Sequence, residues 1–92
     1  MLSSSTILSA SSDVVACELD GGAALLDLKS GSYFRLNQTG SFVWSLLESP
    51  RAFGELFDAM AGHFDVDAEI LSQDLKALIG SLLERGLISA QS

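Results

Sequence analysis

The first half of the chain alternates between apolar and polar positions in the way that β-strands do. The alternation covers residues 14–19, 24–28 and 33–36, and it has the two-residue period of a strand with one buried face. Two glycine-containing segments, 20–22 and 29–32, separate the three stretches, and glycine reaches the positive φ that tight turns often need. This half therefore predicts a small antiparallel meander of three strands.

The second half changes to the period of an α-helix. Asn37 is suited to cap a helix over about residues 38–48, because its side chain can accept from the free N–H groups of the first turn. Pro50 ends that helix. A second helix is expected over about residues 51–63, where apolar residues recur at helical spacing. They are Phe53, Leu56, Phe57, Met60 and Phe64.

A third helix is expected from Asp67, which can cap it, to about Arg85. Gly86 suits a left-handed stop, after which Leu87 can fold back on the last turn. The apolar arc of this helix spans about 140° on a helical wheel, against the ~100° of an ordinary surface helix. Either one edge of the arc is left over for a partner, or the helix is central and contacts both the sheet and the other helices. The arc consists of Leu71, Leu75, Leu78, Ile79, Leu82 and Leu83.

Three strands followed by three helices predict a two-layer α+β fold. A length of 92 residues favours one domain with a core of modest size, and we expect that domain over residues 13–90. Residues 1–12 are rich in serine without a sustained period. They predict a flexible N-terminal lead-in with a short extended piece around Ile7.

The apolar content and the charge limit what this domain can bind. Hydrophobic residues make up 48% of the chain, which favours a folded domain over a disordered one. The net charge is −7, and the scattered cations offer no basic face for phosphates or an anionic membrane. We therefore expect neither nucleic acid nor a membrane as a partner. The negative charge is compatible with binding peptides or other proteins. The cations are Lys29, Arg35, Arg51, Lys76 and Arg85.

The sequence predicts a cytoplasmic protein. Residues 1–12 lack the basic start and the long apolar centre of a signal peptide. No apolar run approaches the ~20 residues that cross a bilayer. Cys17 is the only cysteine, so no internal disulfide is possible, and we expect it to be a small buried thiol.

The search for catalytic residues finds no convincing set. His63 is the only histidine, and a zinc site needs three or four ligands, so it is interpreted as a helix-end residue. No third residue is evident to orient Cys17 and His63 as a nucleophile and base. Asp65 and Asp67 lack the spacing of a calcium loop and are interpreted as helix caps. We expect no metal, no cofactor and no enzymatic activity.

A binding site for a peptide is possible at the last strand of the meander. The open edge of a sheet presents unpaired N–H and C=O groups, and an extended peptide can add itself there as a further strand. If residues 33–36 lie beside the third helix, strand and helix form a groove. The main chain of the strand would then supply affinity, and the apolar edge of the helix would supply pockets for side chains.

Several short features together are similar to one known family. They are Leu26-Asp27-Leu28 before a glycine turn, Leu36-Asn37 followed by Thr39-Gly40, Trp44, Val66-Asp67, Asp74 in the third helix, and Gly86-Leu87-Ile88 at the close. Over about residues 19–88 the chain resembles the PqqD-like peptide-modification chaperones. It looks more like the freestanding chaperones found beside lasso-peptide proteases than like the quinone-pathway protein. One departure is Ala52, where relatives often have a helix-capping threonine.

The resemblance implies a winged-helix-like fold and a function without catalysis. Such domains recognise the leader of a ribosomally made precursor peptide and present it to a maturation enzyme, such as a protease, a cyclase or a radical enzyme. The leader is implied to bind as a strand added to the third strand, in the groove against the third helix. Carried over by position, the residues that pair with the leader are Tyr33, Phe34, Arg35 and Leu36. The residues that line the groove opposite are Leu71, Asp74, Leu75, Leu78 and Leu82.

Two other functions compete with this one. Winged-helix folds often bind DNA, so a transcriptional regulator is an alternative, but the third helix carries Asp74 and Glu84 against Lys76 and Arg85, without a basic excess. A small enzyme subunit is opposed by the lack of a catalytic constellation. Asp74 lies on the rim of the apolar arc, where it is either a solvated surface acid or paired with Lys76 or Arg85. The resemblance instead implies that its carboxylate accepts a hydrogen bond from the leader.

Overall fold

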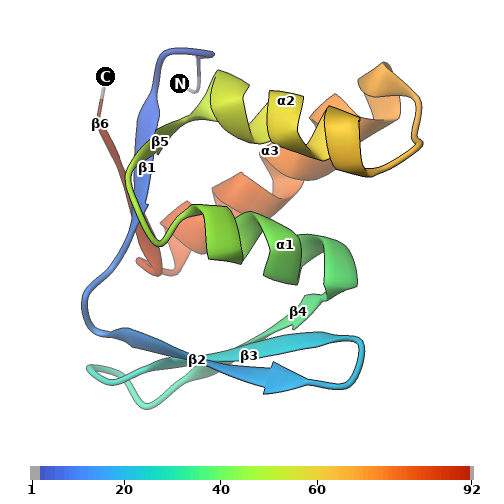
Figure 1. The fold of residues 1–92 in the computed structure, drawn as a ribbon. Coiled ribbons are helices and arrows are strands. Elements are labelled where there is room, and N and C mark those ends of the chain that lie inside the picture. The colour runs from blue at the N-terminus through green and yellow to red at the C-terminus, as the bar shows by residue number, and fades with distance from the viewer. Residues whose placement is uncertain (1–2, 92) are drawn as a thin grey trace.

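Strands β2 (Val14–Leu19), β3 (Gly22–Asp27) and β4 (Tyr33–Asn37) form an antiparallel sheet in that order in the computed structural model, which describes residues 3–91 (Figure 1). The turns contain Gly21 at φ 80° and Gly31 at φ 74°, a region that favours glycine. A Cβ on Gly22 would collide with the carbonyl oxygen of Leu36, so the close approach of β4 also requires glycine there. The predicted meander is confirmed.

Three helices follow the sheet within the described residues, and two of them begin at the expected caps. The side chain of Asn37 accepts from the N–H of Gly40 at 2.8 Å, and that of Asp67 accepts from the N–H of Glu69 at 2.9 Å. Both bonds satisfy amides that have no partner inside their helix. The helices are α1 (Gln38–Leu46), α2 (Phe53–His63) and α3 (Ala68–Glu84).

The end of α3 is a Schellman motif. The N–H of Leu87 donates to the carbonyl of Leu82 at 3.0 Å, and the N–H of Gly86 donates to that of Leu83 at 3.1 Å. Gly86 has a φ of 72°, the left-handed conformation that this motif requires. Leu87 is buried, so the motif turns the chain back toward the core as the sequence predicted.

A second antiparallel sheet lies beside the helices and corrects the expected start of the domain. It has the order β5-β1-β6, with β1 (Ile7–Ala10) between β5 (Arg51–Ala52) and β6 (Ile88–Gln91). Leu8 in β1 is fully buried, so the chain belongs to the core well before residue 13. These strands are too short, and too far apart in the chain, for a two-residue period to reveal their pairing. Met1 and Leu2, also placed in the expected lead-in, lie outside the described residues.

The N-terminal segment also supplies the start of α2. The N–H of Phe53 donates to the carbonyl of Thr6 at 2.8 Å, and the N–H of Gly54 donates to that of Ser4 at 3.0 Å. Ala52 precedes the helix and makes no side-chain cap. Main-chain carbonyls from residues 4–6 therefore take the place of the threonine cap that relatives often carry, and the helix begins at Phe53 rather than at residue 51.

One continuous core joins the two sheets and the helices. Helix α1 lies between the β2-β3-β4 sheet and the other two helices (Figure 1), and Trp44 on this helix is buried in the core. The α+β class, with a three-stranded antiparallel sheet followed by three helices, is confirmed, and the strands β1, β5 and β6 of the second sheet are additional to the predicted elements. The largest fully buried side chains are Leu8, Leu25, Val43, Leu47, Leu56, Met60, Leu75, Ile79 and Leu82.

Strand β2 is exposed along most of its length, which corrects the prediction for Cys17. The thiol is exposed rather than buried. The strand register places Cys17 beside Ala24, and Ala24 beside Arg35, on the face of the sheet that points away from α1. The alternation along β2 was recognised from the sequence, but which of its two faces the helices cover depends on how the sheet packs.

Candidate functional site

The outer edge of β4 is free to bind an added strand. Among residues 3–91, strand β4 pairs with β3 and with no other strand. The N–H of Asp27 donates to the carbonyl of Ser32 at 3.0 Å, and hydrogen-bonded pairs alternate along an antiparallel ladder. The alternation directs the N–H and C=O groups of Tyr33 and Arg35 away from β3, toward the open edge. These two residues therefore offer the main-chain groups that an added strand needs.

The side chains of β4 alternate between solvent and core. Tyr33 and Arg35 are exposed, whereas Phe34 is half-buried and Leu36 is 5% exposed. Leu36 anchors the strand to the core and leads directly into the cap of α1. Of these four predicted leader-pairing residues, Tyr33 and Arg35 offer main-chain groups, Phe34 offers part of its ring, and Leu36 has a supporting role.

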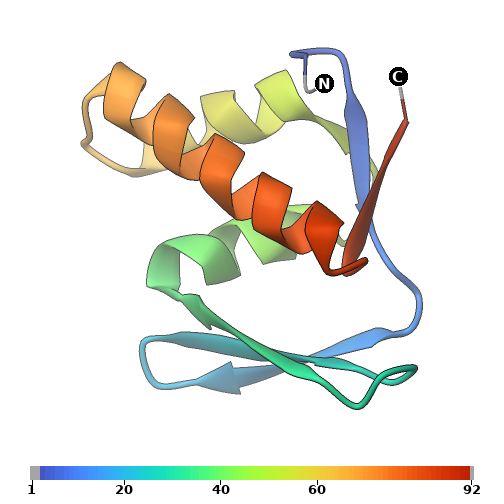
Figure 2. The same cartoon turned by 180° about the vertical axis from the view of Figure 1, so that it is seen from behind.

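Helix α3 faces the open edge of β4. In Figure 2, α3 and β4 lie on the same side of the molecule, with α1 behind them. Two hollows lie between the two elements, one near each end of β4. We refer to the two hollows together as the β4–α3 groove.

The first hollow lies at the start of β4, where α3 ends, and has a volume of about 260 Å³. The guanidinium of Arg85 lies over the ring of Phe34, 5.0 Å from its centroid, so a cation and an aromatic ring form one wall. The site combines polar and apolar surface and suits a side chain that has both. It is lined by Asp27, Ser30, Ser32, Tyr33, Phe34, Arg85 and Leu87.

The second hollow lies at the end of β4, where α1 begins, and has a volume of about 380 Å³. Leu78 is half-buried there and Asp74 is exposed, so an apolar surface lies beside a carboxylate. The side-chain oxygen of Asn37 is already used by the N–H of Gly40. The hollow is lined by Asn37, Thr39, Gly40, Met60, Asp74, Leu75, Ala77 and Leu78.

The two hollows differ in their charged groups, because the second holds the carboxylate of Asp74 and the first holds the guanidinium of Arg85 together with the carboxylate of Asp27. The one ion pair within residues 3–91 joins Lys29 to Asp13 at 3.2 Å, so neither Asp74 nor Arg85 is neutralised by a salt bridge in this part of the chain. Arg85 also follows the last turn of α3, where a cation is favourable. A peptide bound there would meet a carboxylate near one end, and both a guanidinium and a carboxylate near the other.

The structure divides the groove residues expected on α3 into two groups. Asp74, Leu75 and Leu78 line the second hollow, but Leu75 is only 1% exposed and also belongs to the core. Leu71 and Leu82 are 3% and 0% exposed and belong to the core, so they support the helix without offering surface to a ligand. Most of the broad apolar arc thus packs inside the protein, as expected of a central helix, and Leu78 is the part that reaches the groove.

Several groove residues were not predicted as site residues. Arg85 was recognised only as one of the scattered cations, and its place over Phe34 depends on how α3 crosses β4. Thr39 and Gly40 were recognised only as features shared with a known family. Asn37 was predicted as a helix cap, but a cap signal does not say which helix faces it across the groove.

Two negative observations apply to residues 3–91. No group of three or more His, Cys, Asp or Glu residues there is placed to hold a metal ion. None of the helices in this part of the chain combines the length and the apolar character needed to span a bilayer.

Comparison with known proteins assigns the family. The sequence model of coenzyme PQQ synthesis protein D (PqqD) matches residues 22–88, which is well over half of the chain. The chain belongs to the PqqD family. The resemblance inferred from the sequence is thereby confirmed. A search of curated protein sequences finds no match to this PqqD-family chain.

Two solved structures have the fold of this PqqD-family chain. One is TbiB1 in complex with the TbiA(beta) leader peptide, with a TM-score of 0.80 and 32% sequence identity, covering 91% of this chain and 98% of TbiB1. The other is a lasso peptide synthetase B1 complexed with the leader peptide, with a TM-score of 0.75 and 24% identity, covering 89% of this chain and 96% of that one. At 24% identity the second likeness concerns the fold alone.

Proposed function

We propose that this chain binds the leader of a ribosomally synthesised precursor peptide as a strand added to β4, and that it presents the leader to a maturation enzyme. The observation that carries the proposal is the open edge of β4, where the main-chain groups of Tyr33 and Arg35 face outward beside the β4–α3 groove. TbiB1, which shares 32% identity with this chain, was solved with a leader peptide bound. That likeness supports a leader peptide as the ligand.

The two hollows provide the selectivity that main-chain pairing lacks. Hydrogen bonds to Tyr33 and Arg35 hold any extended peptide, whereas side chains that alternate along the added strand reach different surfaces. The hollow at Leu78 takes an apolar side chain, and Asp74 beside it accepts a hydrogen bond from the leader. The hollow at Phe34 and Arg85 takes a side chain with both apolar and polar parts.

In this proposal the chain contributes binding and the maturation enzyme contributes the chemistry. The enzyme is one that acts on the leader-bearing precursor, such as a leader protease. We place the function in the cytoplasm, where the ribosome makes the precursor. DNA binding gains no support, since the net charge is −7 and α3 exposes Glu69, Asp74 and Glu84 against Lys76.

Titration of a fluorescently labelled cognate leader, followed by anisotropy, tests the proposal. We expect saturable binding with a Kd around micromolar or tighter, which corresponds to about −8 kcal/mol. Arg35→Pro removes an N–H from the open edge, and proline is tolerated on an edge strand where its missing N–H would face solvent. We expect this variant to weaken binding roughly tenfold, the value of one or two lost hydrogen bonds.

Arg35→Ala is the matched comparison, because it removes the side chain and keeps the N–H. We expect a smaller loss of affinity than in Arg35→Pro. Circular dichroism and a thermal melt establish that both variants are folded. Absence of saturable leader binding by the folded parent would overturn the proposal, and equal affinity of Arg35→Pro and the parent would exclude strand addition at β4.

A further inference from the structure

Strand β6 has an open edge of its own, in the sheet β5-β1-β6. Among residues 3–91 it pairs with β1 and with no other strand, and both ribbon views show it at the margin of the molecule (Figures 1 and 2). Its register with β1 is regular from Ile88 to Gln91, so no bulge turns the strand away from an approaching chain. We call the side of β6 that is turned away from β1 the β6 edge.

The main-chain groups at the β6 edge belong to Ile88 and Ala90. The N–H of Ser11 donates to the carbonyl of Leu87 at 2.9 Å, which continues the pairing of β1 with β6 by one position. Hydrogen-bonded pairs alternate along an antiparallel ladder. Ser89 therefore also bonds to β1, whereas Ile88 and Ala90 direct their N–H and C=O groups outward.

The β6 edge lacks the features that normally keep edge strands apart. Such strands are usually protected by charged side chains, above all lysine, or by proline. Neither residues 1–12 nor residues 86–92 contain a charged side chain or a proline. The charged residue of this sheet, Arg51, lies on β5 at the opposite side of β1. The two strands next to the edge are therefore uncharged, in a protein whose net charge is −7.

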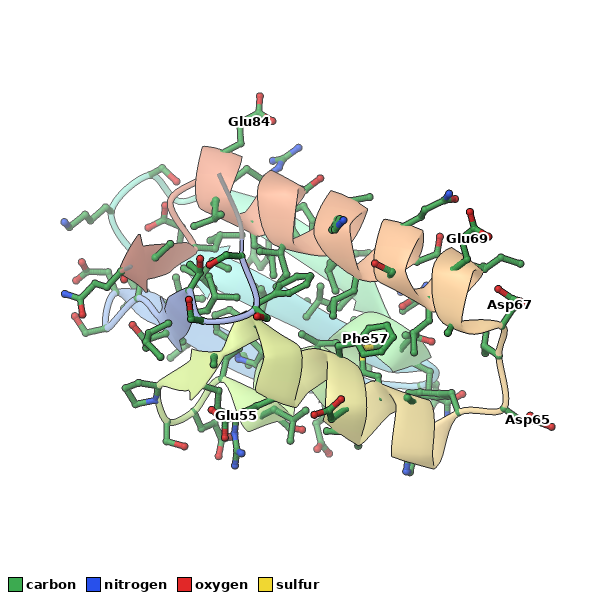
Figure 3. All side chains as sticks on the ribbon, turned by 90° about the horizontal axis from the view of Figure 1, so that it is seen from above. Glu55, Phe57, Asp65, Asp67, Glu69 and Glu84 are labelled. Atoms are coloured by element: carbon green, nitrogen blue, oxygen red, sulfur yellow. The ribbon has the colours of Figure 1, made fainter. Side chains whose placement is uncertain are left out.

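This charge pattern favours a second copy of the chain as the occupant of the edge. In a two-fold dimer the same patch of both copies meets, so most surfaces of an acidic protein would bring like charges together. An uncharged edge keeps that repulsion small. A basic partner would instead gain more from the acidic surface that carries Asp65, Asp67 and Glu69 (Figure 3).

The groups of the β6 edge are also placed symmetrically about Ser89. Ile88 and Ala90 lie one residue to either side of it and both face outward. In an antiparallel pair of β6 strands centred on Ser89, Ile88 of each copy exchanges two main-chain hydrogen bonds with Ala90 of the other. All outward groups of these two residues are then satisfied. The two Ser89 residues face each other across the two-fold axis as a pair without main-chain hydrogen bonds, in which side chains lie close together.

We propose that this chain forms a weak two-fold dimer through antiparallel pairing of the β6 edges of two copies, which joins their three-stranded sheets into one. The strand is short, so we expect a Kd on the order of 100 µM. The inference does not rest on leader binding, because the groups offered to the leader lie on β4, in the other sheet. Each copy in the dimer keeps its own open β4.

Sedimentation velocity of the intact chain over a range of concentrations tests the dimer. We expect the average mass to rise from that of a monomer to that of a dimer. Raising the NaCl concentration from about 50 to about 500 mM should lower the dimer Kd by roughly threefold or more, because salt screens the repulsion between two acidic copies. A parent that stays monomeric at about 1 mM in high salt would overturn the proposal, as would a dimer that salt weakens.

Ala90→Pro tests the main-chain pairing. It removes an outward N–H, and proline is tolerated on an edge strand where its missing N–H faces solvent. Each dimer loses two hydrogen bonds, so we expect the dimer Kd to rise by roughly tenfold. Ala90→Ser keeps the N–H and is the matched control, which should dimerise as the parent does. An unchanged dimer Kd in Ala90→Pro, with the circular dichroism of the parent, would exclude pairing through β6.

A charge exchange at Ser89 tests the register and does not depend on how the proline variant folds. Ser89 is exposed, and Ser89→Lys or Ser89→Glu places two like charges across the two-fold axis, which is destabilising. We expect each variant alone to be monomeric where the parent is dimeric, and an equimolar mixture of the two to form a heterodimer. Ser45→Glu, at an exposed position on α1, should dimerise as the parent does. Dimers that persist in both single variants, or a mixture that does not associate, would overturn the inference.

Discussion

The guanidinium of Arg85 lies over the ring of Phe34, 5.0 Å from its centroid, and so joins the end of α3 to the open strand β4. The contact closes one end of the β4–α3 groove. The two residues are 51 positions apart in the sequence. Their contact therefore depends on how helix α3 packs against strand β4.

The first prediction concerns the coupling of these two residues. Arg85→Ala removes the cation, and Phe34→Leu removes the aromatic face while keeping an apolar side chain. A cation over an aromatic ring at an exposed site stabilises by about 0.5–1 kcal/mol, so we expect a double-mutant cycle to give a coupling free energy of that size. Urea denaturation of the four proteins measures it. A coupling free energy of zero would mean that the contact does not hold α3 to β4.

The second prediction concerns Asp74 in the other hollow. If its carboxylate accepts a hydrogen bond from the leader, Asp74→Ala removes a charge-assisted bond of roughly 1.5–3 kcal/mol. We then expect leader affinity to fall by about ten- to a hundredfold, because each factor of ten corresponds to about 1.4 kcal/mol. Fluorescence anisotropy measures the affinity, and the melting temperature should change little because the side chain is exposed.

Glu84→Ala is the control for Asp74. Glu84 is an exposed acid near the end of α3 and points away from the rest of the molecule (Figure 3). We expect its replacement to change neither the leader affinity nor the melting temperature. If both variants bind the leader like the parent, Asp74 takes no part in recognition and the leader contacts another edge of α3.

The third prediction concerns the N-terminal strand. Leu8 is fully buried in β1, whereas Ile7 beside it is 37% exposed. Leu8→Ala leaves a cavity in the core and should lower the free energy of unfolding by about 2–5 kcal/mol. Ile7→Ala, which removes a similar side chain from the other face of the same strand, should cost distinctly less. Equal and small effects in urea denaturation would show that β1 is dispensable and that residues 1–12 behave as a lead-in after all.

The local elements of this protein follow from its sequence, because their signals lie within a few residues of each other. Gly21 and Gly31 mark the turns of the meander, Asn37 and Asp67 cap their helices, and Gly86 ends α3. Each of these features satisfies or relaxes a backbone constraint at its own position. The order of the three meander strands and the three helices, and with it the fold class, was therefore predictable, whereas β1, β5 and β6 were not.

Half of the candidate site was predictable in the same way. An open-edged strand before a capped helix predicted a place for an added peptide at residues 33–36. Asp74 was placed on the rim of the apolar arc, but only the resemblance to the PqqD-like chaperones made it an expected contact of the leader. The helical wheel does not show which leucines of the arc remain exposed in the folded protein. Burial of Leu71 and Leu82, and exposure of part of Leu78, depend on how α2, β6 and the rest of the core pack against α3.

Only the tertiary structure decided the features that join distant segments. The pairing of Ile7 with Gln91 brings together segments from opposite ends of the sequence. A strand of four residues has too few positions for its sequence pattern to predict which distant strand it pairs with. The exposure of Cys17 was decided by the side of the sheet on which α1 packs. A two-residue period shows that a strand has two different faces, but the face that becomes buried is the one that another layer covers, and that layer is brought there by the rest of the chain.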